Sequence, residues 1–349
     1  IKIMAYSTIS KPGLHFNTKT TTGTGNSQAV TGLGFQPDWI WGKRRDGSGN
    51  HTLFDAVRGI TKGLESNGTG SEFTSTDYYS SFDSDGFTIA AGGGGAGNAN
   101  GNTAVQWCWK ANGAGSSNTD GSINTTATSV NTTAGISIIT YTGTGSAATI
   151  GHGLGVVPDF WMVKARSETR AWYGWCKGMS YGDVINWSHS GAKSTDASLF
   201  TSSAPTNQVI NLGNSVGVNN RGQTFVCYAF SSIKGFSKMG SYTGTQNANG
   251  NFIYLGFEPA YIMFKNTGAN ENWAVFDNKR DNYYNPVKKY LQPNDTAADQ
   301  NSLVDFLSNG FKLRQNEYRM TQANKIIYMA FAKHPLVANV GQSIPTTAR

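Results

Sequence analysis

The chain has 349 residues, of which 14% are charged and 43 are glycine, and its formal net charge is +7. A helix-rich protein needs long runs of Ala, Leu, Glu, Lys and Arg, and this sequence lacks them. β-Branched and aromatic residues separated by Gly, Asn and Ser instead indicate strands joined by turns, so we predict an all-β protein. The positive charge comes without a dense basic stripe, and no apolar stretch reaches the 18 or so residues of a membrane span, so we expect neither nucleic-acid binding nor membrane insertion.

Three related sequences dominate the chain. In each, a Gly stands three residues before a Pro, apolar residues follow the Pro, and a Lys stands six residues after it; the copies are 34–43, 155–164 and 256–265. Each copy closes on an apolar strand, and 72 residues separate the Pro from an aromatic residue of that strand in all three. These pairs are Pro37 and Trp109, Pro158 and Phe230, and Pro259 and Phe331. Three equal spacings predict one structural unit repeated three times.

The repeats divide the chain into expected domains. We predict an N-terminal segment at 1–20, a first β-domain at 21–112, a second at 139–232, a third at 233–335 and a tail at 336–349. Residues 113–138 are rich in Gly, Ser, Thr and Asn, which predicts an exposed linker or an extended surface strand. Each repeat is near 95 residues, which is enough for a small core. Frequent turns between short strands favour a β-sandwich, jelly-roll-like domain, so we expect three such domains in tandem.

Local patterns place some elements within a repeat. Pro37, Pro158 and Pro259 are expected just before a strand, where the missing N–H costs no ladder bond. Residues 82–89 and 306–313 match position for position, and each has Asp-Gly or Asn-Gly between apolar flanks. Both segments are predicted to form β-hairpins.

The sequence offers little chemistry for a metal, a cofactor or a nucleophile. Asp83 and Asp85 resemble the start of a calcium loop, but the third copy has Leu307 where the first has Asp83. The three cysteines are too far apart for a CxxC site and are expected to be buried free thiols. No His or Ser lies in a Gly-x-Ser-x-Gly elbow. We therefore predict no cofactor, no metal ion and no catalytic residues, although carboxylate pairs distant in sequence are not excluded.

Lysines recur in all three copies, at Lys43, Lys164 and Lys265. One interpretation is that they bind an acidic glycan or a partner's carboxylates. The favoured one is that each stands at a strand end and blocks edge-to-edge pairing.

Aromatic residues beyond the first strand of the later repeats are the candidate binding residues. Flat rings with a polar edge suit stacking on a sugar or contact with a protein, whereas core or interdomain packing is the alternative. The predicted ligand-binding residues are Trp172, Tyr173, Trp175, Trp187, Tyr283 and Tyr284.

The order and spacing of several short segments resemble a family of structural proteins of marine tailed bacteriophages. The segments that carry the resemblance are 6–12, 16–18, 32–38, 53–59, 81–87, 107–111, 141–145, 151–155 and 330–332. They span nearly the whole chain. The middle copy departs from the pattern, because Trp175-Cys176 replaces a Phe-Asp pair, and this puts in doubt an equivalent binding role for Asp55 and Asp277.

This resemblance implies a component of the virion surface. The expected function is that of a tail-fibre or appendage protein in host attachment, with no enzymatic activity. Residues 1–20, with Lys11, Pro12, Phe16 and Asn17, would attach it to the particle or make it trimeric. Expected partners are other virion proteins, further copies of the chain, with a trimer as the analogy, and a host surface glycan. The alternatives are a capsid decoration or head-fibre protein, a soluble carbohydrate-binding lectin and, third, a polysaccharide depolymerase.

Overall fold

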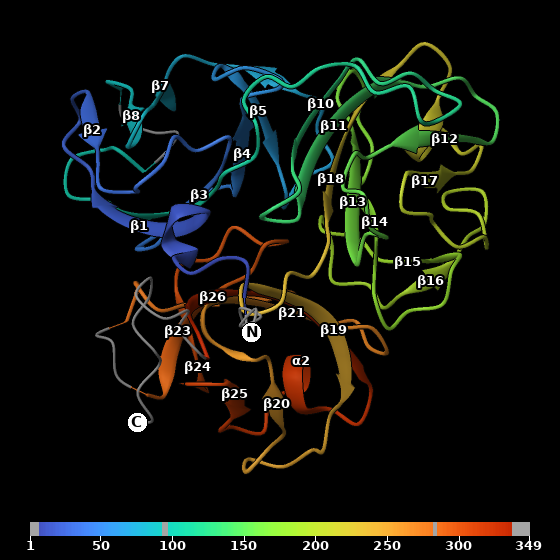
Figure 1. Ribbon diagram of the computed structural model, residues 1–349. Coiled ribbons are helices and arrows are strands. Elements are labelled where there is room, and N and C mark those ends of the chain that lie inside the picture. The colour runs from blue at the N-terminus through green and yellow to red at the C-terminus, as the bar shows by residue number, and fades with distance from the viewer. Residues whose placement is uncertain (1–6, 93–96, 282–284, 337–349) are drawn as a thin grey trace, which may run out of the picture.

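The computed structural model describes residues 7–92, 97–281 and 285–336. It is nearly all-β, as predicted. Within these residues the helical elements are single turns: η1 (Pro12–Leu14), α1 (Val216–Asn219) and α2 (Tyr318–Thr321). Figure 1 shows three lobes around a common centre, with the first and second lobes above and the third below.

The first lobe holds two sheets that enclose a small core. Its six-stranded sheet has the order β1-β9-β3-β4-β5-β6, and β2, β8 and β7 form a three-stranded sheet. Side chains of both sheets, including Tyr79, Phe87 and Ile40, meet in one buried cluster. The strands are β1 (Phe16–Thr22), β2 (Gln28–Val30), β3 (Trp39–Arg44), β4 (Thr52–Asp55), β5 (Lys62–Glu65), β6 (Phe73–Thr74), β7 (Tyr79–Asp83), β8 (Gly86–Ile89) and β9 (Thr103–Trp109).

The second lobe is built on a five-stranded sheet of order β10-β11-β18-β13-β14. Two short ladders, β12-β17 and β15-β16, accompany it. The strands are β10 (Ala127–Asn131), β11 (Ile136–Thr142), β12 (Ala148–Gly151), β13 (Phe160–Ala165), β14 (Tyr173–Cys176), β15 (Asp183–Val184), β16 (Ser194–Thr195), β17 (Val209–Leu212) and β18 (Thr224–Phe230).

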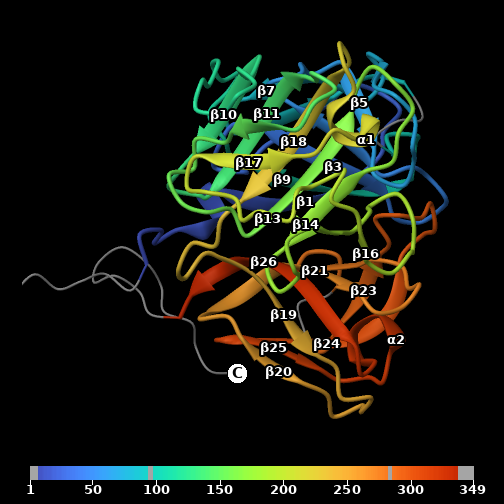
Figure 2. The same cartoon turned by 90° about the vertical axis from the view of Figure 1, so that its right-hand side faces the viewer.

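The third lobe is one curled sheet of eight strands, in the order β19-β26-β21-β22-β23-β24-β25-β20. Figure 2 shows it curving into a nearly closed, barrel-like shape, around a core of its own. Its strands are β19 (Ser237–Thr243), β20 (Phe252–Tyr254), β21 (Phe257–Asn266), β22 (Ala274–Asp277), β23 (Val287–Leu291), β24 (Gln300–Leu307), β25 (Gly310–Leu313) and β26 (Lys325–Pro335).

One block of four antiparallel strands recurs in the lobes. The orders β1-β9-β3-β4, β11-β18-β13-β14 and β19-β26-β21-β22 are equivalent, because each runs first, last, third and fourth along its repeat. The register agrees as well: Trp39 faces Trp109, Phe160 faces Phe230, and Tyr261 faces Phe331. These pairs follow from the equal spacings in the sequence, since each begins two residues after the repeated proline.

Both predicted hairpins are confirmed. In β7–β8, Asp83 faces Gly86, and in β24–β25, Leu307 faces Gly310, so each loop has two residues. The predicted positions of the three repeated prolines, each just before a strand, are confirmed in part. Pro37 and Pro158 precede their strands, whereas Pro259 lies inside β21 at an irregularity in its pairing with β26. A bulge accommodates the missing N–H there.

Some predicted boundaries differ from the structure. Strand β1 begins at Phe16, so residues 16–20 belong to the first sheet rather than to a separate N-terminal segment. The predicted linker at 113–138 contains β10, which pairs with β11, and its Ser129 is fully buried. The tail from 337 onward lies outside the described residues.

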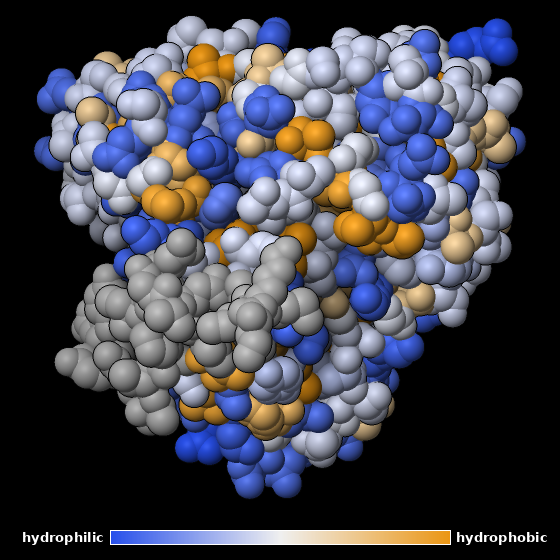
Figure 3. Space-filling model, in the orientation of Figure 1, coloured by the Kyte–Doolittle hydropathy of each residue, from blue (hydrophilic) through white to orange (hydrophobic). Residues whose placement is uncertain are grey.

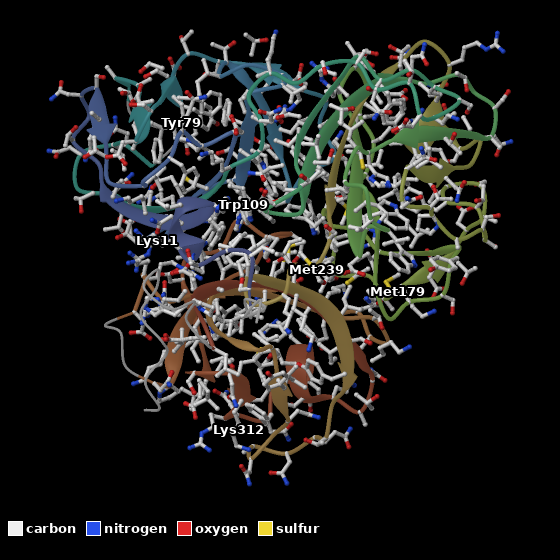
Figure 4. The ribbon with its side chains drawn as sticks, in the orientation of Figure 1. Lys11, Tyr79, Trp109, Met179, Met239 and Lys312 are labelled. Carbon is white, nitrogen blue, oxygen red and sulfur yellow. The ribbon has the colours of Figure 1, made fainter. Side chains whose placement is uncertain are left out.

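The cores of the lobes are joined. A continuous buried cluster takes side chains from all three, and Trp109 lies where the lobes meet (Figure 4). Trp39 of the first lobe stacks on Tyr228 of the second at 4.5 Å between ring centroids. Phe16 stacks on Phe331 of the third at 5.0 Å. The aromatic residues therefore do not form three separate cores, one for each repeat.

Candidate ligand-binding site

The predicted binding residues Trp172 and Trp187 are completely buried. Trp172 Nε1 donates a hydrogen bond to the carbonyl of Glu65 in the first lobe, at 2.8 Å. Trp187 packs against Trp41, also of the first lobe, with 5.0 Å between ring centroids. A ring enclosed on both faces has no surface for a sugar, so these two tryptophans hold lobes together, which was the alternative interpretation from the sequence.

The other predicted aromatic residues have different surroundings. Tyr173 is half-buried and its ring lies against the backbone of Gly217 in α1. Trp175 is only 5% exposed, but it lies directly beneath an exposed ring. Tyr283 and Tyr284 lie outside the described residues.

The exposed ring belongs to Tyr181, which the sequence analysis did not single out. Three rings stack from the core to the surface: Trp161 on Trp175 at 4.7 Å, and Trp175 on Tyr181 at 5.3 Å. Tyr181 is 40% exposed. Its position follows from a turn in which Asp183 N–H donates to the carbonyl of Ser180. Gly182, third in this turn, has a φ of 87°, which favours glycine and leaves Tyr181 at the exposed corner.

A cavity of about 370 Å³ opens beside this stack. Its lining includes Val156 and Val157, which are 50% and 44% exposed, together with Tyr181 and Trp175. Ligand pockets in proteins begin at about 300 Å³ and combine apolar walls with a few polar groups. We call this cavity, with its three stacked rings, the ring site.

The ring site also carries an ion pair. Lys177 Nζ lies 2.9 Å from Asp159 Oδ1, with 60% of the lysine side chain exposed. Asp159 Oδ2 accepts a hydrogen bond from the backbone N–H of Ser232, which fixes the carboxylate. An exposed ring beside charged and hydroxyl groups is an arrangement that stacks on a sugar ring and hydrogen-bonds its hydroxyls.

A second cavity, of about 340 Å³, lies in the third lobe and has an acidic lining. Glu258 pairs there with Lys333 at 2.9 Å, and Asp305 pairs with Arg314 at 2.9 Å. Asn285 bonds the backbone of Phe306 through both its Nδ2 and its Oδ1, so its amide is engaged in the fold. Glu258 and Asp305 therefore each already have a basic partner.

The predicted attachment residues are mostly parts of the fold. Pro12 is buried in η1, and Phe16 is 1% exposed in the central cluster. Asn17 Nδ2 donates to the carbonyl of Leu33 at 3.2 Å. Lys11 is exposed, and Figure 4 shows it at the edge of the molecule.

The repeated lysines are buried at the junctions between lobes, so both interpretations of them from sequence are wrong. They lie in β3, β13 and β21, each of which has a strand on both sides and needs no edge protection. Each Nζ donates to a carbonyl of another lobe: Lys43 to Thr296, Lys164 to Thr69 and Lys265 to Ser190, at 3.1, 3.3 and 3.1 Å. Burial lowers the pKa of all three lysines to about 8.

A buried ion-pair network closes the junction between the first and second lobes. Asp55 Oδ2 accepts hydrogen bonds from Arg58 Nε at 2.6 Å and from the Tyr228 hydroxyl at 2.7 Å. Arg58 also bonds Glu72, which pairs with Arg166 of the second lobe at 2.8 Å. Burial lowers the pKa of Arg58, but Asp55, Tyr228 and Glu72 outweigh burial and raise it, so the guanidinium stays charged.

The junction between the third and first lobes repeats this network. Asp277 Oδ2 accepts hydrogen bonds from Arg280 Nε at 2.6 Å and from Trp107 Nε1 at 2.9 Å. Arg280 bonds Asp299 at 2.9 Å, and Asp299 pairs with Arg45 of the first lobe at 3.1 Å. The doubt that the sequence raised about Asp55 and Asp277 as equivalent binding groups is thus answered: both carboxylates are fully buried and hold lobes together.

The junction between the second and third lobes lacks such a network at the corresponding positions. Cys176 and Met179 stand there at the same distances from Pro158 as Asp55 and Arg58 from Pro37. Both side chains are buried, and burial raises the pKa of the Cys176 thiol, which keeps it neutral. Trp273 Nε1 donates across this junction to the carbonyl of Asn186 at 2.7 Å.

Among the described residues, no group of three or more His, Cys, Asp or Glu side chains is placed to hold a metal ion. In the same part of the chain, no helix is long and apolar enough to cross a membrane. The predicted absence of a cofactor stays a prediction.

Comparison with known proteins assigns one family to the chain. Residues 11–335 match a family described as a domain of unknown function, DUF7483. The chain belongs to the DUF7483 family. The match covers all three lobes, so the DUF7483 domain includes every repeat and every junction described above. No curated protein matches the chain.

Proposed function

We propose that this protein is a structural component of a bacteriophage virion surface, a tail-fibre or appendage protein that attaches to the host. The resemblance of its sequence segments supports a virion component. The ring site supports attachment, and it is the observation on which this role depends. An exposed tyrosine on a rigid stack of rings provides a ready surface for the sugars of a host envelope.

The architecture supports a role that requires stiffness. We infer that the lobes are three copies of one β-unit, which forms two facing sheets in the first lobe and a single curled sheet in the third, because the four-strand block and its register recur in each. Buried hydrogen bonds and ion pairs join the copies, and such contacts resist relative movement of the lobes. A stiff body of this kind suits a protein that connects a particle to a surface.

Immunoelectron microscopy of purified particles tests the virion assignment. Antibody raised against the purified chain is expected to label tails or tail tips. Label over the head instead supports the alternative of a capsid decoration protein. Particles that carry no label, from a lysate in which the antibody detects the free chain, would overturn the assignment.

The oligomeric state and the anchor need separate experiments. We propose a trimer, and light scattering of the purified chain is expected to give about three times the 37.4 kDa chain mass. Because Ile9 lies in the central cluster and Phe16 in the sheet, an attachment segment is confined to the residues before Ser7. A chain that begins at residue 7 is expected to fold and to fail to join particles.

A soluble lectin is the second candidate, and the ring site favours it as well. It is distinguished by glycan binding without any association with particles. Neither candidate requires catalysis, so the purified protein is expected to release no reducing sugar from host polysaccharide. A rise in reducing ends with added protein would instead support a depolymerase.

A further inference from the structure

A third cavity, separate from the acidic one described above, continues the ring site across the junction of the second and third lobes. It has a volume of about 430 Å³ and shares Lys177 and Ser232 with the ring site. Lys238 and Tyr328 of the third lobe line its far side. Figure 4 labels Met179 and Met239 on the two sides of this junction, and Figure 3 shows hydrophobic surface between the upper lobes and the lower lobe. We call the two cavities together the junction groove.

The third-lobe half of the groove is positively charged. Its described lining residues include Lys177 and Lys238 and no acidic side chain. Lys325 reaches the same place, because its Nζ donates to the carbonyl of Gly178 at 2.7 Å. Burial, then the nearby charge of Lys177, lowers the pKa of Lys238. Lys177 pairs with Asp159, and Lys238 Nζ donates to the carbonyl of Tyr254 at 2.6 Å. An anion here would add a charge-assisted hydrogen bond to the contacts that these two ammonium groups already make.

The floor of this half is built from small and hydroxyl-bearing residues. Gly178 has a φ of 101°, and a Cβ there would collide with Ser241 Oγ. A Cβ at Gly240 would lie 2.9 Å from the Tyr328 hydroxyl. At both positions the missing Cβ makes room for a hydroxyl-bearing side chain of the third lobe, so Ser241 and Tyr328 pack closely here and supply the hydroxyl groups of this lining.

We propose that the junction groove binds an acidic oligosaccharide. One sugar ring stacks on Tyr181 in the ring site, and a carboxylate or sulfate of a neighbouring sugar lies between Lys177 and Lys238. This inference rests on the proposed attachment function and specifies its ligand. A nucleic acid is less favoured, because Tyr181 supplies one exposed ring rather than a row of stacking platforms along a basic channel.

Calorimetric titration of the full-length chain tests the proposal. The probes are oligogalacturonate, which has a carboxylate on each sugar, and its methyl ester, which has the same rings without charge. The native chain is expected to bind the acid form at least about tenfold more tightly than the ester. Lys177→Gln combined with Lys238→Gln is expected to abolish this preference, and Tyr181→Ala to weaken binding of both probes.

The control variant removes two lysines elsewhere. Lys11→Gln combined with Lys312→Gln has the same charge change, and Figure 4 shows both residues away from the groove. This variant is expected to keep the preference for the acid form, and far-ultraviolet circular dichroism checks that each variant is folded.

Several outcomes would overturn the inference, and they separate it from the proposed function. Equal affinity for acid and ester, with both lost in Tyr181→Ala, leaves glycan attachment standing and removes the acidic ligand. If inorganic sulfate binds as tightly as oligogalacturonate and Tyr181→Ala has no effect, the groove is an anion site without a sugar. Tighter, lysine-dependent binding of a single-stranded oligonucleotide identifies a nucleic-acid site. If neither these probes nor a panel of neutral and acidic glycans binds, the attachment role fails together with the inference.

Discussion

Two kinds of junction hold the three lobes together. The first–second and third–first junctions each enclose a carboxylate, a guanidinium and a second acid, as with Asp55, Arg58 and Glu72. The second–third junction has Cys176 and Met179 at the corresponding positions and is neutral there. All three junctions keep the buried lysine. The comparison indicates that the buried lysine is needed wherever two lobes pack together. The ion pair and the neutral Cys-Met pair are two alternative ways to fill the corresponding positions of a junction.

The difference has a physical basis. A buried ion pair gains little over apolar residues of the same volume, because the cost of removing both charges from water offsets their attraction. Breaking such a pair, however, leaves one charge buried without its partner. The two charged junctions are therefore expected to be sensitive to single substitutions and tolerant of paired ones.

The largest effect is expected from removal of one carboxylate. Asp277→Ala leaves Arg280 buried and Trp107 Nε1 without its acceptor, so the free energy of unfolding is expected to fall by about 3–5 kcal/mol. Urea denaturation measures this loss. The control is Asp46→Ala, which breaks the exposed pair with Arg44 and is expected to cost at most about 1 kcal/mol. Equal losses in the two variants would contradict a structural role for the buried pair.

The second prediction replaces the charged residues of the first–second junction by the residues that occupy the same positions in the neutral junction. Asp55→Cys alone is expected to destabilise by about 3 kcal/mol or more, because Arg58 loses the nearer of its two carboxylate partners and keeps only Glu72. Adding Arg58→Met is expected to recover part of this loss. Recovery is incomplete, since Glu72 and Tyr228 then lack a hydrogen-bond partner that they have in the native chain. A double variant less stable than Asp55→Cys would show that the two kinds of junction are not interchangeable.

The third prediction concerns the lysines that all junctions share. Replacing one by Met leaves carbonyls of two lobes without their donor, which is expected to cost about 1–3 kcal/mol. Lys43→Met, Lys164→Met and Lys265→Met are expected to give similar losses in the same urea assay. If only the variants at the two charged junctions lose stability, the lysine has no common role in holding the lobes together.

The smallest effect is a dependence on pH. His51, Trp172 and Trp273 occupy the same distance from the three prolines. Burial, then the nearby charge of Lys43, lowers the pKa of His51 well below its usual value, so it stays neutral in the folded chain. The unfolded chain binds the proton below pH 6.5, so stability falls as pH falls there, by up to about 1.4 kcal/mol per unit from this residue.

Urea denaturation at pH 6.5 and 5.5 measures this dependence. His51→Phe is expected to lose less stability between these values than the native chain. Trp172→Phe, the matched change in the second lobe, is expected to leave the slope as it is. If stability depends on pH equally in His51→Phe and in the native chain, then His51 has the same pKa in the folded and unfolded states.

Much of the fold follows from spacing alone. The 72-residue distances locate the strands that pair in each lobe, and the Asp-Gly and Asn-Gly turns locate two hairpins. Strand β1 is harder to recognise, because only Phe16 and Thr18 of its seven residues are buried. Its equivalent β11 is buried along nearly its whole length, and the predicted second repeat at 139–232 contains only the part of it from residue 139 onward.

The candidate site was less accessible to prediction, because its determinants are contacts between lobes. Nothing near Trp172 or Lys164 in the sequence indicates that their partners are the carbonyls of Glu65 and Thr69. Tyr181 had a usable signal, since an aromatic residue before a glycine in a turn is exposed at the corner. Lys238 and Lys177 are 61 positions apart, and only the docking of the lobes brings them to one cavity.

The most direct test of the whole account is a density map of the virion detailed enough to place the three lobes. The account predicts that the chain lies on the outside of the particle, at the tail, with Tyr181 and Lys238 facing away from neighbouring virion proteins. A map in which the chain is absent, or in which the junction groove is covered by another virion protein, would contradict it.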